Sequence, residues 1–290
     1  MTSDGARTTP GGLYVHESGE GPLVVLIHGV MDRSSGMLRT RRLLQGEHRV
    51  VRYDRRGYGR SKAAAPSDDF DRQVTDLLEV LDGRPAVVVG HSFGGVVALG
   101  LADRYPDLAR SVVAYEAPMM WEPWWPGGAT PVAAAAGETD GGAAAEDGDG
   151  DSGDGGSPAG GGPPGARGEA PADVAEWFMR RMIGDDLWER LPPAMRADRR
   201  SEGPALLADM ASARPPAPVP YVAERIGVPV LAAHGGATRP RHRRTAEELA
   251  RLVPGAELAI VPGADHGVHL SDPAGFAALV RRGVERATDR

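Results

Sequence analysis

The chain has 290 residues and no cysteine; this length fits one large α/β domain with an insertion, and disulfide bonds and thiolate metal sites are excluded. The formal net charge is −7, and without a large basic face nucleic-acid binding is not expected. No apolar run approaches the length of a membrane span, and the N-terminus lacks the apolar stretch of a secretory signal, so we expect a cytoplasmic protein with no membrane insertion.

Apolar runs and helical spacing alternate along residues 1–126, the predicted first part of the core. The run at 23–27 is continuously apolar, which is typical of a strand covered on both faces. Apolar residues between Phe70 and Leu81 recur at helical spacing, which predicts a helix over 69–81. Such alternation implies a mostly parallel sheet with helices on both faces. Further strands are predicted at 13–16, 49–53, 86–89 and 111–115, and a further helix at 38–44.

The alternation breaks after Glu116. Residues 127–170 are rich in Gly, Ala, Asp and Pro, and the seven acids between 127 and 166 account for the whole negative excess. Such a segment has too few large apolar side chains to offset its ordering entropy, so we predict a disordered insertion or a mobile loop; an acidic interaction tract is the alternative. Helical spacing then predicts a helical lid over 171–225. The second part of the core is predicted over 226–290, with strands at 228–234 and 258–261 and helices at 245–252 and 273–284.

Two charged stretches are interpreted as structural. The basic cluster at 239–244 is taken as a solvated helix start or loop rather than a polyanion site. The loop at 54–61 has the sequence Asp-Arg-Arg-Gly-Tyr-Gly-Arg-Ser. Its glycines suit tight turns, and Asp54 is expected to accept hydrogen bonds from local backbone amides. Arg55 and Arg56 are therefore not expected to bind substrate directly.

The most informative stretch is Gly90-His91-Ser92-Phe93-Gly94. It follows an apolar strand and precedes a segment of small residues that is predicted to be helical. A serine at such a sharp strand-to-helix turn is held at the edge of the sheet, with its hydroxyl free to attack a carbonyl. The flanking glycines matter because a tight turn leaves no room for Cβ atoms near the nucleophile.

Four stretches, in the family's order, resemble motifs of the α/β-hydrolase family. They frame most of residues 12–116 and 226–288, and although each is short, the four together are a strong signal. The resemblance implies the α/β-hydrolase fold, a mostly parallel sheet with helices on both faces and an inserted helical lid. The stretches are Leu26-Ile27-His28-Gly29-Val30-Met31, the loop at 54–61, the serine turn and Pro262-Gly263-Ala264-Asp265-His266-Gly267.

The resemblance also implies a serine nucleophile that is activated by a histidine. Ser92 is the expected nucleophile, and His266, which follows the last strand, is the expected general base. Histidine suits this task because its pKa lies near working pH. The backbone amides of Val30 and Phe93 are the expected oxyanion hole, with Met31 next in line.

The triad acid is where the sequence departs from the family pattern. An Asp usually follows the penultimate strand, but Thr238 stands there, and an uncharged hydroxyl cannot stabilise an imidazolium as a carboxylate does. Some members carry the acid after the strand that follows the nucleophile helix, where this chain has Glu116. The residues after Glu116 also resemble that stretch of haloalkane dehalogenases. We therefore predict Glu116 as the acid; a structural salt bridge for Glu116, or Asp265 as the acid, are the alternatives.

The residues around the predicted triad suggest an apolar pocket, and the expected partner is a small, apolar, ester-like molecule. No cofactor or metal is expected, because His269 lies near His266 without carboxylates at metal-ligand spacing. His91 is expected to pack or to shape the pocket wall, and the oligomeric state is left open. The predicted pocket residues are His28, Gly29, Met31, His91, Trp121 and Trp177.

The expected reaction is serine-dependent hydrolysis of a carboxylic ester, thioester or lactone. C–C bond hydrolysis, cofactor-free perhydrolysis of the haloperoxidase type and lyase chemistry are alternatives on the same site, because the fold hosts many reactions. A binding protein without turnover is a further alternative, which Thr238 favours and which Ser92 and His266 oppose. Haloalkane dehalogenase and epoxide hydrolase chemistry is not expected, because both need a carboxylate nucleophile and position 92 is serine.

Overall fold

The computed structural model describes residues 5–125 and 170–288. Within them, eight strands form one sheet in the order β1-β2-β4-β3-β5-β6-β7-β8. The strand β2 is antiparallel to both of its neighbours, and every other pair is parallel. The strands are β1 (Gly5–Thr8), β2 (Tyr14–Ser18), β3 (Leu23–Ile27), β4 (Arg49–Tyr53), β5 (Ala86–His91), β6 (Ala109–Tyr115), β7 (Val230–Gly235) and β8 (Glu257–Val261).

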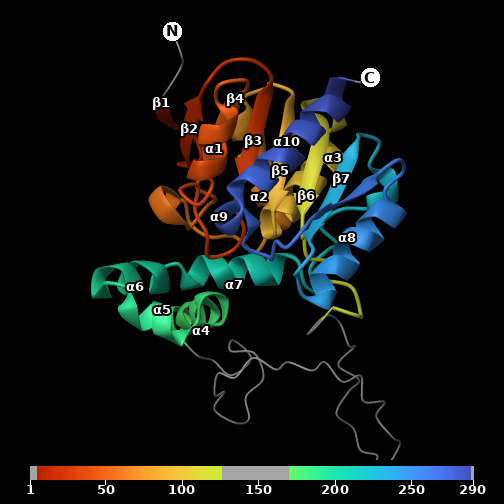
Figure 1. The fold of residues 1–290 in the computed structure, drawn as a ribbon. Coiled ribbons are helices and arrows are strands. Elements are labelled where there is room, and N and C mark those ends of the chain that lie inside the picture. Colours follow the sequence, from red (N-terminus) through yellow and green to blue (C-terminus); the bar gives the residue numbers. More distant parts are fainter. Residues whose placement is uncertain (1–4, 126–169, 289–290) are drawn as a thin grey trace, which may run out of the picture.

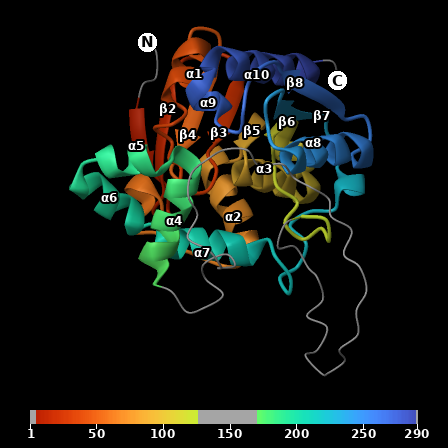
Figure 2. The ribbon, with the colours of Figure 1, turned by 60° about the horizontal axis from the view of Figure 1, so that its bottom comes forward.

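The central strands are apolar on both faces because helices cover both. Successive side chains of a strand point to opposite faces, so in β5 Val88 packs into one hydrophobic core while Val87 and Val89 pack into another. The helices α2, α3 and α8 line the first core, and α1, α9 and α10 line the second (Figures 1 and 2). The core helices are α1 (Leu38–Leu44), α2 (Phe70–Leu81), α3 (Phe93–Arg104), α8 (Pro240–Leu252), α9 (Val268–Ser271) and α10 (Pro273–Thr288).

The helix α2 shows how local sequence sets an element. The side chain of Asp69 caps the helix by accepting a hydrogen bond from the backbone amide of Asp71, and Asp82 ends it in the left-handed conformation. Such a cap stabilises a helix by about 1 kcal/mol. Phe70 and Val74 are among the buried residues that face the core. The helix predicted over 69–81 is therefore confirmed.

Within residues 170–288, four α-helices precede β7 and form a layer below the sheet in Figure 1. Asp209 of the last one is buried and accepts two hydrogen bonds from Arg55, at 3.0 and 2.6 Å. Tyr58 donates a third, at 2.8 Å. Removing one partner of such a buried pair typically costs about 3–5 kcal/mol, so this contact fixes the inserted helices to the core. They are α4 (Pro171–Ile183), α5 (Asp185–Arg190), α6 (Pro193–Arg200) and α7 (Gly203–Ser212).

Several predicted boundaries differ from the structure. The edge strand β1 was missed, since Gly5–Thr8 is short and largely exposed and has no apolar pattern. The helix α8 begins at Pro240, five residues before the predicted start at 245, because its first turn is basic rather than apolar. The insertion predicted at 127–170 lies, apart from Ala170, outside the described residues. No helix within 5–125 or 170–288 is both long and apolar enough to cross a membrane.

Candidate active site

Ser92 lies in the sharp turn between β5 and α3. Its backbone has a φ of 53° and a ψ of −126°, a conformation that costs energy for any residue with a Cβ and that persists where function needs it. The Ser92 amide donates to the carbonyl of Tyr115 at 2.8 Å. A Cβ on Gly90 would lie 2.2 Å from the carbonyl oxygen of Gly94. The turn therefore requires glycine there, as the sequence predicted.

Glu116 follows β6 directly and is completely buried. It too has a positive φ, 48°, and its own amide donates to the carbonyl of Ala233 at 2.8 Å. Its Oε1 accepts a hydrogen bond from the amide of Gly235 at 2.9 Å, and its Oε2 accepts one from Nδ1 of His266 at 2.6 Å. The buried carboxylate thus has a partner on each oxygen and fixes the ring of His266.

His266 lies in the loop between β8 and α9, and two strand-end residues hold that loop. Nε2 of His91 donates to the carbonyl of His266 at 2.6 Å, and the hydroxyl of Tyr115 donates to the carbonyl of Asp265 at 2.7 Å. Because Nδ1 carries the proton shared with Glu116, Nε2 is left as the basic nitrogen.

His91 and Tyr115 therefore anchor the loop that bears His266. They immediately precede Ser92 and Glu116 in the chain. Among the described residues, the Ser92 hydroxyl makes no hydrogen bond. Catalytic hydrogen bonds often form only once substrate is bound, so the missing bond does not count against Ser92 as the nucleophile.

The turn after β3 lies against Ser92. A Cβ on Gly29 would lie 2.9 Å from the Cβ of Ser92, and Met31 has a φ of 52°. Within the described residues, neither the amide of Val30 nor that of Phe93 donates to another group. Phe93 is the first residue of α3, where amides have no partner within the helix and favour an anion. Both amides are available for an oxyanion.

Both predicted pocket histidines, His28 and His91, are buried. His28 is fully buried; its Nδ1 donates to the carbonyl of Gly29 at 2.7 Å, and its Nε2 accepts from the amide of Arg55 at 2.9 Å. Burial lowers its pKa, so the ring is neutral and holds the loop at 54–61, and contact of His28 with substrate stays a prediction. His91 is also buried, and burial together with the neighbouring His269 and His266 holds its pKa well below the usual value.

The two predicted pocket tryptophans lie in different surroundings. Trp121 is half-buried and meets Tyr221 edge-on, with ring centroids 5.2 Å apart. Trp177 is 40% exposed on α4, with Arg181 over its ring at 5.4 Å. Contact of either ring with substrate stays a prediction.

Sequence reasoning missed His242, which lies in the first turn of α8. Its ring stacks on that of His266, with centroids 4.4 Å apart and an angle of 21°. Burial, the neighbouring His266 and two nearby arginines lower the pKa of His242 to about 2, so this imidazole is neutral. No apolar or motif signal marks His242, because it stands within a basic cluster.

Thr238, at the usual position of the acid, is buried and its hydroxyl has no partner among the described residues.

A second carboxylate–imidazole pair lies nearby, between Asp32 and His269. Oδ2 of Asp32 is 3.0 Å from Nε2 of His269, and the ring of His269 lies 4.3 Å from that of His91. Burial alone would raise the pKa of Asp32, but contact with His269 outweighs it and holds that pKa low. The ligand atoms of Asp32, His91 and His269 lie within 4.8 Å of one another, as do those of Glu116, His242 and His266, so either group has donors suited to a metal ion.

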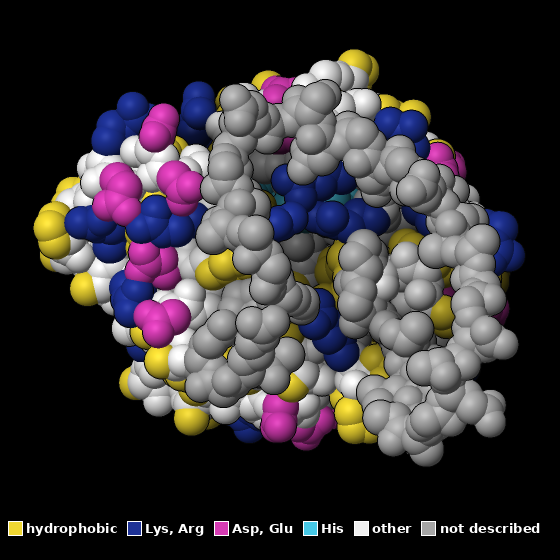
Figure 3. Space-filling view, turned by 90° about the horizontal axis from the view of Figure 1, so that it is seen from below, with side chains coloured by type: hydrophobic (Ala, Val, Ile, Leu, Met, Phe, Trp, Pro, Cys, Tyr) yellow, Lys and Arg dark blue, Asp and Glu magenta, His cyan; other side chains and the backbone are white. Residues whose placement is uncertain are grey.

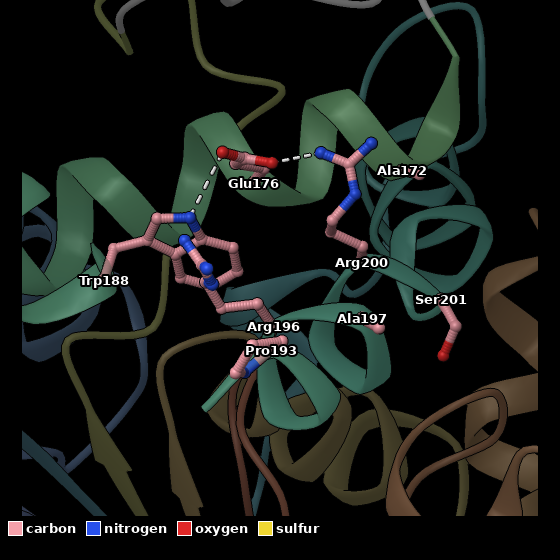
Figure 4. A pocket seen from close by; sticks show the side chains of 8 residues that line it. All are labelled: Ala172, Glu176, Trp188, Pro193, Arg196, Ala197, Arg200 and Ser201. Atoms are coloured by element: carbon pink, nitrogen blue, oxygen red, sulfur yellow. Dashed lines mark hydrogen bonds and ion pairs between the residues drawn. The ribbon is translucent and has the colours of Figure 1, made fainter. Parts of the chain in front are cut away.

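A pocket of about 480 Å³ lies within the inserted helices (Figure 4). Glu176 lines one side of it, between Trp188 and Arg200, and accepts hydrogen bonds from Nε1 of Trp188 at 3.1 Å and from Arg200. None of its lining residues belongs to the predicted triad or oxyanion hole, so this pocket is separate from the candidate active site. It is lined by Ala172, Glu176, Trp188, Pro193, Arg196, Ala197, Arg200 and Ser201.

The fold and the serine turn define an α/β hydrolase, and comparison with known proteins agrees. The model of the alpha/beta hydrolase family matches residues 24–279, so the chain belongs to that family. This membership supports an enzyme of the hydrolase class, as predicted.

Among curated proteins, the chain is similar to 2-(acetamidomethylene)succinate hydrolase of Mesorhizobium japonicum, with 33% identity over 107 residues, 36% of this chain and 38% of that protein. It is also similar to epoxide hydrolase 4 of Mus musculus, with 31% identity over 121 residues, 39% of this chain and 34% of that protein. The chain therefore matches less than half the length of these relatives.

Solved structures share the fold over nearly the whole chain. An enol-lactonase from Burkholderia xenovorans aligns with a TM-score of 0.65 at 22% identity, covering 97% of this chain and 100% of that one. A bromoperoxidase from Bacillus anthracis aligns with a TM-score of 0.65 at 18% identity, again over 97% and 100%. At these identities the likeness establishes the fold alone.

Proposed function

We propose that this protein hydrolyses an ester-like carbonyl, in a carboxylic ester, thioester or lactone, through a covalent intermediate on Ser92. One observation carries the proposal: the buried carboxylate of Glu116 accepts a hydrogen bond from Nδ1 of His266 at 2.6 Å. This bond fixes the tautomer that a general base needs and stabilises the imidazolium that forms when the base takes a proton.

The reaction proceeds in two halves. In the first, Nε2 of His266 takes the hydroxyl proton of Ser92 as the oxygen attacks the carbonyl carbon. The resulting oxyanion is stabilised by the amides of Val30 and Phe93. The carbonyl forms again as the bond to the leaving group breaks, and the leaving oxygen or sulfur takes the proton from His266.

The second half releases the acid. Water attacks the acyl-enzyme while His266 accepts its proton, and the bond between the acyl group and Ser92 breaks as the serine oxygen takes that proton back. Glu116 stays ionised throughout and balances the transient charge on His266.

The chemistry at position 92 separates this proposal from that of one similar protein. Epoxide hydrolase chemistry is not proposed, because the family's epoxide hydrolases use a carboxylate nucleophile and this chain has serine. A similar structure is an enol-lactonase, and a lactone is a cyclic ester, which supports an ester-like substrate. The half-buried Val30 and the buried Met31 beside the oxyanion hole support an apolar group next to the carbonyl.

The test is covalent labelling with a fluorophosphonate probe together with a panel of chromogenic esters of varied acyl chain. Wild-type protein is expected to be labelled at Ser92, as located by peptide mass mapping, and to hydrolyse at least one ester. Ser92→Ala should lose both. Folded wild-type protein that takes up no label and turns over no ester would instead be a binding protein with this fold.

A further inference from the structure

Three polar side chains from separate segments meet beside the candidate active site. Asp32 lies in the loop between β3 and α1, His91 is the last residue of β5, and His269 lies in α9. One oxygen or nitrogen atom of each lies within 4.8 Å of the corresponding atoms of the other two. We refer to these three residues as the donor trio. Two imidazoles and a carboxylate form a donor set that divalent transition-metal ions bind.

The hydrogen bond of His91 leaves one ring nitrogen available. Nε2 donates to the carbonyl of His266 at 2.6 Å, and because a carbonyl only accepts, Nε2 carries the proton. The ring is neutral, since burial and the neighbouring histidines hold its pKa well below the usual value. Nδ1 therefore has a free lone pair, and it has no hydrogen-bond partner among the described residues. Metal-bound histidines typically donate their other ring N–H to a carbonyl or carboxylate in this way.

The free nitrogen of His91 lies against the loop that bears Asp32. A Cβ on Gly29, in the same loop, would lie 3.2 Å from Nδ1 of His91 and 2.9 Å from the Cβ of Ser92. On another side, the ring of His269 lies 4.3 Å from that of His91 and is tilted by 50°, so the two rings do not stack face to face. The lone pair of His91 is thus close to both of the other segments of the donor trio.

Asp32 and His269 also have buried atoms without hydrogen bonds. Oδ2 of Asp32 lies 3.0 Å from Nε2 of His269, but within the described residues neither atom has a hydrogen bond of normal geometry, and nor has Nδ1 of His269. His91 and His269 are only 5% and 2% exposed, so bulk solvent cannot satisfy their nitrogens. Buried polar atoms usually have partners, and an ion bound among these atoms would be one.

Glu116, His242 and His266 form a second group with donor atoms at similar distances, but its carboxylate is already used. The two oxygens of Glu116 accept hydrogen bonds from the amide of Gly235 at 2.9 Å and from Nδ1 of His266 at 2.6 Å. A metal ion bound to this carboxylate would compete with those bonds. The unpartnered atoms of the donor trio have no such bond to lose, so the trio is the better metal site.

We propose that Asp32, His91 and His269 bind a divalent transition-metal ion of the zinc class, with water completing the coordination. Donor atoms at about 2.1 Å from a tetrahedral ion lie about 3.4 Å apart, and Oδ2 of Asp32 and Nε2 of His269 already lie 3.0 Å apart. The two imidazoles favour Zn²⁺, Co²⁺ or Ni²⁺ over Mg²⁺ and Ca²⁺, which prefer oxygen ligands. The sequence did not indicate this site, because Asp32 is remote from His269 in the chain.

Such an ion would join the three segments that surround the candidate catalytic residues. The loop after β3 contains Val30, β5 leads into Ser92, and α9 follows the loop that bears His266. The ion would stabilise their arrangement from outside the predicted triad. The side chain of Asp32 is 20% exposed, and histidine side chains are visible near the middle of the face seen from below (Figure 3), so a small ion can reach the histidine-bearing part of the protein.

The experiment is a calorimetric titration of ZnCl₂ into protein without a histidine tag, since a tag would itself bind zinc. Wild-type protein should bind Zn²⁺ at least about 10²-fold more tightly than Mg²⁺, and its Tm should rise as zinc is added. Asp32→Asn and His269→Gln should each weaken zinc binding by at least about 10²-fold, because losing a ligand costs more than losing an outer partner.

His242→Gln is the matched control, because it makes the same replacement as His269→Gln but removes a donor of the second group. Its affinity for zinc should equal that of wild type. Circular dichroism establishes that each variant is folded, and if His269→Gln does not fold, Asp32→Asn gives the same comparison. None of these measurements needs turnover, so the result is independent of the proposed function.

Three results would overturn the proposal. One is wild-type protein that binds no zinc. Another is zinc binding that persists unchanged in Asp32→Asn. The third is zinc binding that His242→Gln weakens as much as Asp32→Asn does, which would assign the ion to the second group.

Discussion

Two carboxylate–imidazole pairs meet the ring of His91, next to Ser92, and they differ in which partner is shielded. In the pair of Glu116 and His266 the carboxylate is fully buried and the imidazole side chain is 20% exposed. In the pair of Asp32 and His269 the imidazole is 3% exposed and the carboxylate is 20% exposed. In the first pair the carboxylate is the shielded partner, and in the second pair the imidazole is.

This difference indicates what each pair can do. A general base must reach substrate and water, whereas its orienting acid works best when it is shielded and held. Glu116 and His266 meet that requirement. His269 is enclosed between Asp32 and His91, so its pair stabilises the turn after β3 and does not exchange protons with substrate.

The largest predicted effect comes from removing the imidazole of each pair. His266→Ala should lower kcat/KM by on the order of 10⁶-fold, because the serine loses its base. His269→Ala should change it by about tenfold at most, but should lower the free energy of unfolding by about 1–3 kcal/mol by leaving Asp32 unpaired. Ester kinetics and urea denaturation of the two variants measure both quantities. Similar losses of kcat/KM in the two variants would contradict the assignment of His266, rather than His269, as the general base.

The next largest loss of rate is expected from replacing the acid of the first pair, Glu116, in comparison with the acid of the second, Asp32. Glu116→Gln should lower kcat by about 10⁴-fold, because an amide holds the ring but cannot balance its charge. Asp32→Asn should lower kcat by far less and should mainly affect stability. Steady-state kinetics on one chromogenic ester tests both. Equal losses would mean that the acid has been assigned to the wrong position.

The buried histidines predict how stability depends on pH. Burial lowers the pKa of His28, His91 and His242, so below about pH 6.5 the unfolded chain binds protons that the folded protein does not. Stability is therefore greatest above that pH and falls as pH decreases, by at most about 1.4 kcal/mol per pH unit for each histidine that stays neutral in the folded protein. Urea denaturation between pH 7.5 and 5.5 should show this fall, and His91→Gln should reduce its slope. A flat profile would contradict the buried, neutral state.

The smallest effect is expected at the position where the family usually has its acid. Thr238→Ala should leave kcat within about threefold of wild type, because the Thr238 hydroxyl bonds nothing among the described residues and Glu116 already binds His266. The same ester assay measures it. A loss approaching that of Glu116→Gln would show that Thr238 orients the base.

The sequence predicted the fold well because its signals are local. The continuous apolar runs of the central strands, the spacing in α2 and the glycines of the serine turn each fix a conformation without help from distant residues. The four family motifs likewise predicted the α/β-hydrolase fold from short local stretches. The position of Glu116 at the end of a strand, together with the family resemblance, nominated it as the acid, and this assignment stays a prediction.

Contacts between distant residues could not be predicted in this way. The stacking of His242 on His266 depends on how α8 meets the loop after β8, and the pairing of Asp32 with His269 joins residues far apart in the chain. His28 lies in a family motif, but the motif does not show that its Nε2 accepts a hydrogen bond from the amide of Arg55.

The most direct test of the central claim is the rate at which a fluorophosphonate labels Ser92 in paired variants. The account predicts that Glu116→Gln slows labelling by at least 10²-fold, since the proton transfer to His266 limits attack, while Asp32→Asn labels within about threefold of wild type. Labelling that Asp32→Asn slows as much as Glu116→Gln does, or that neither variant slows, would contradict it.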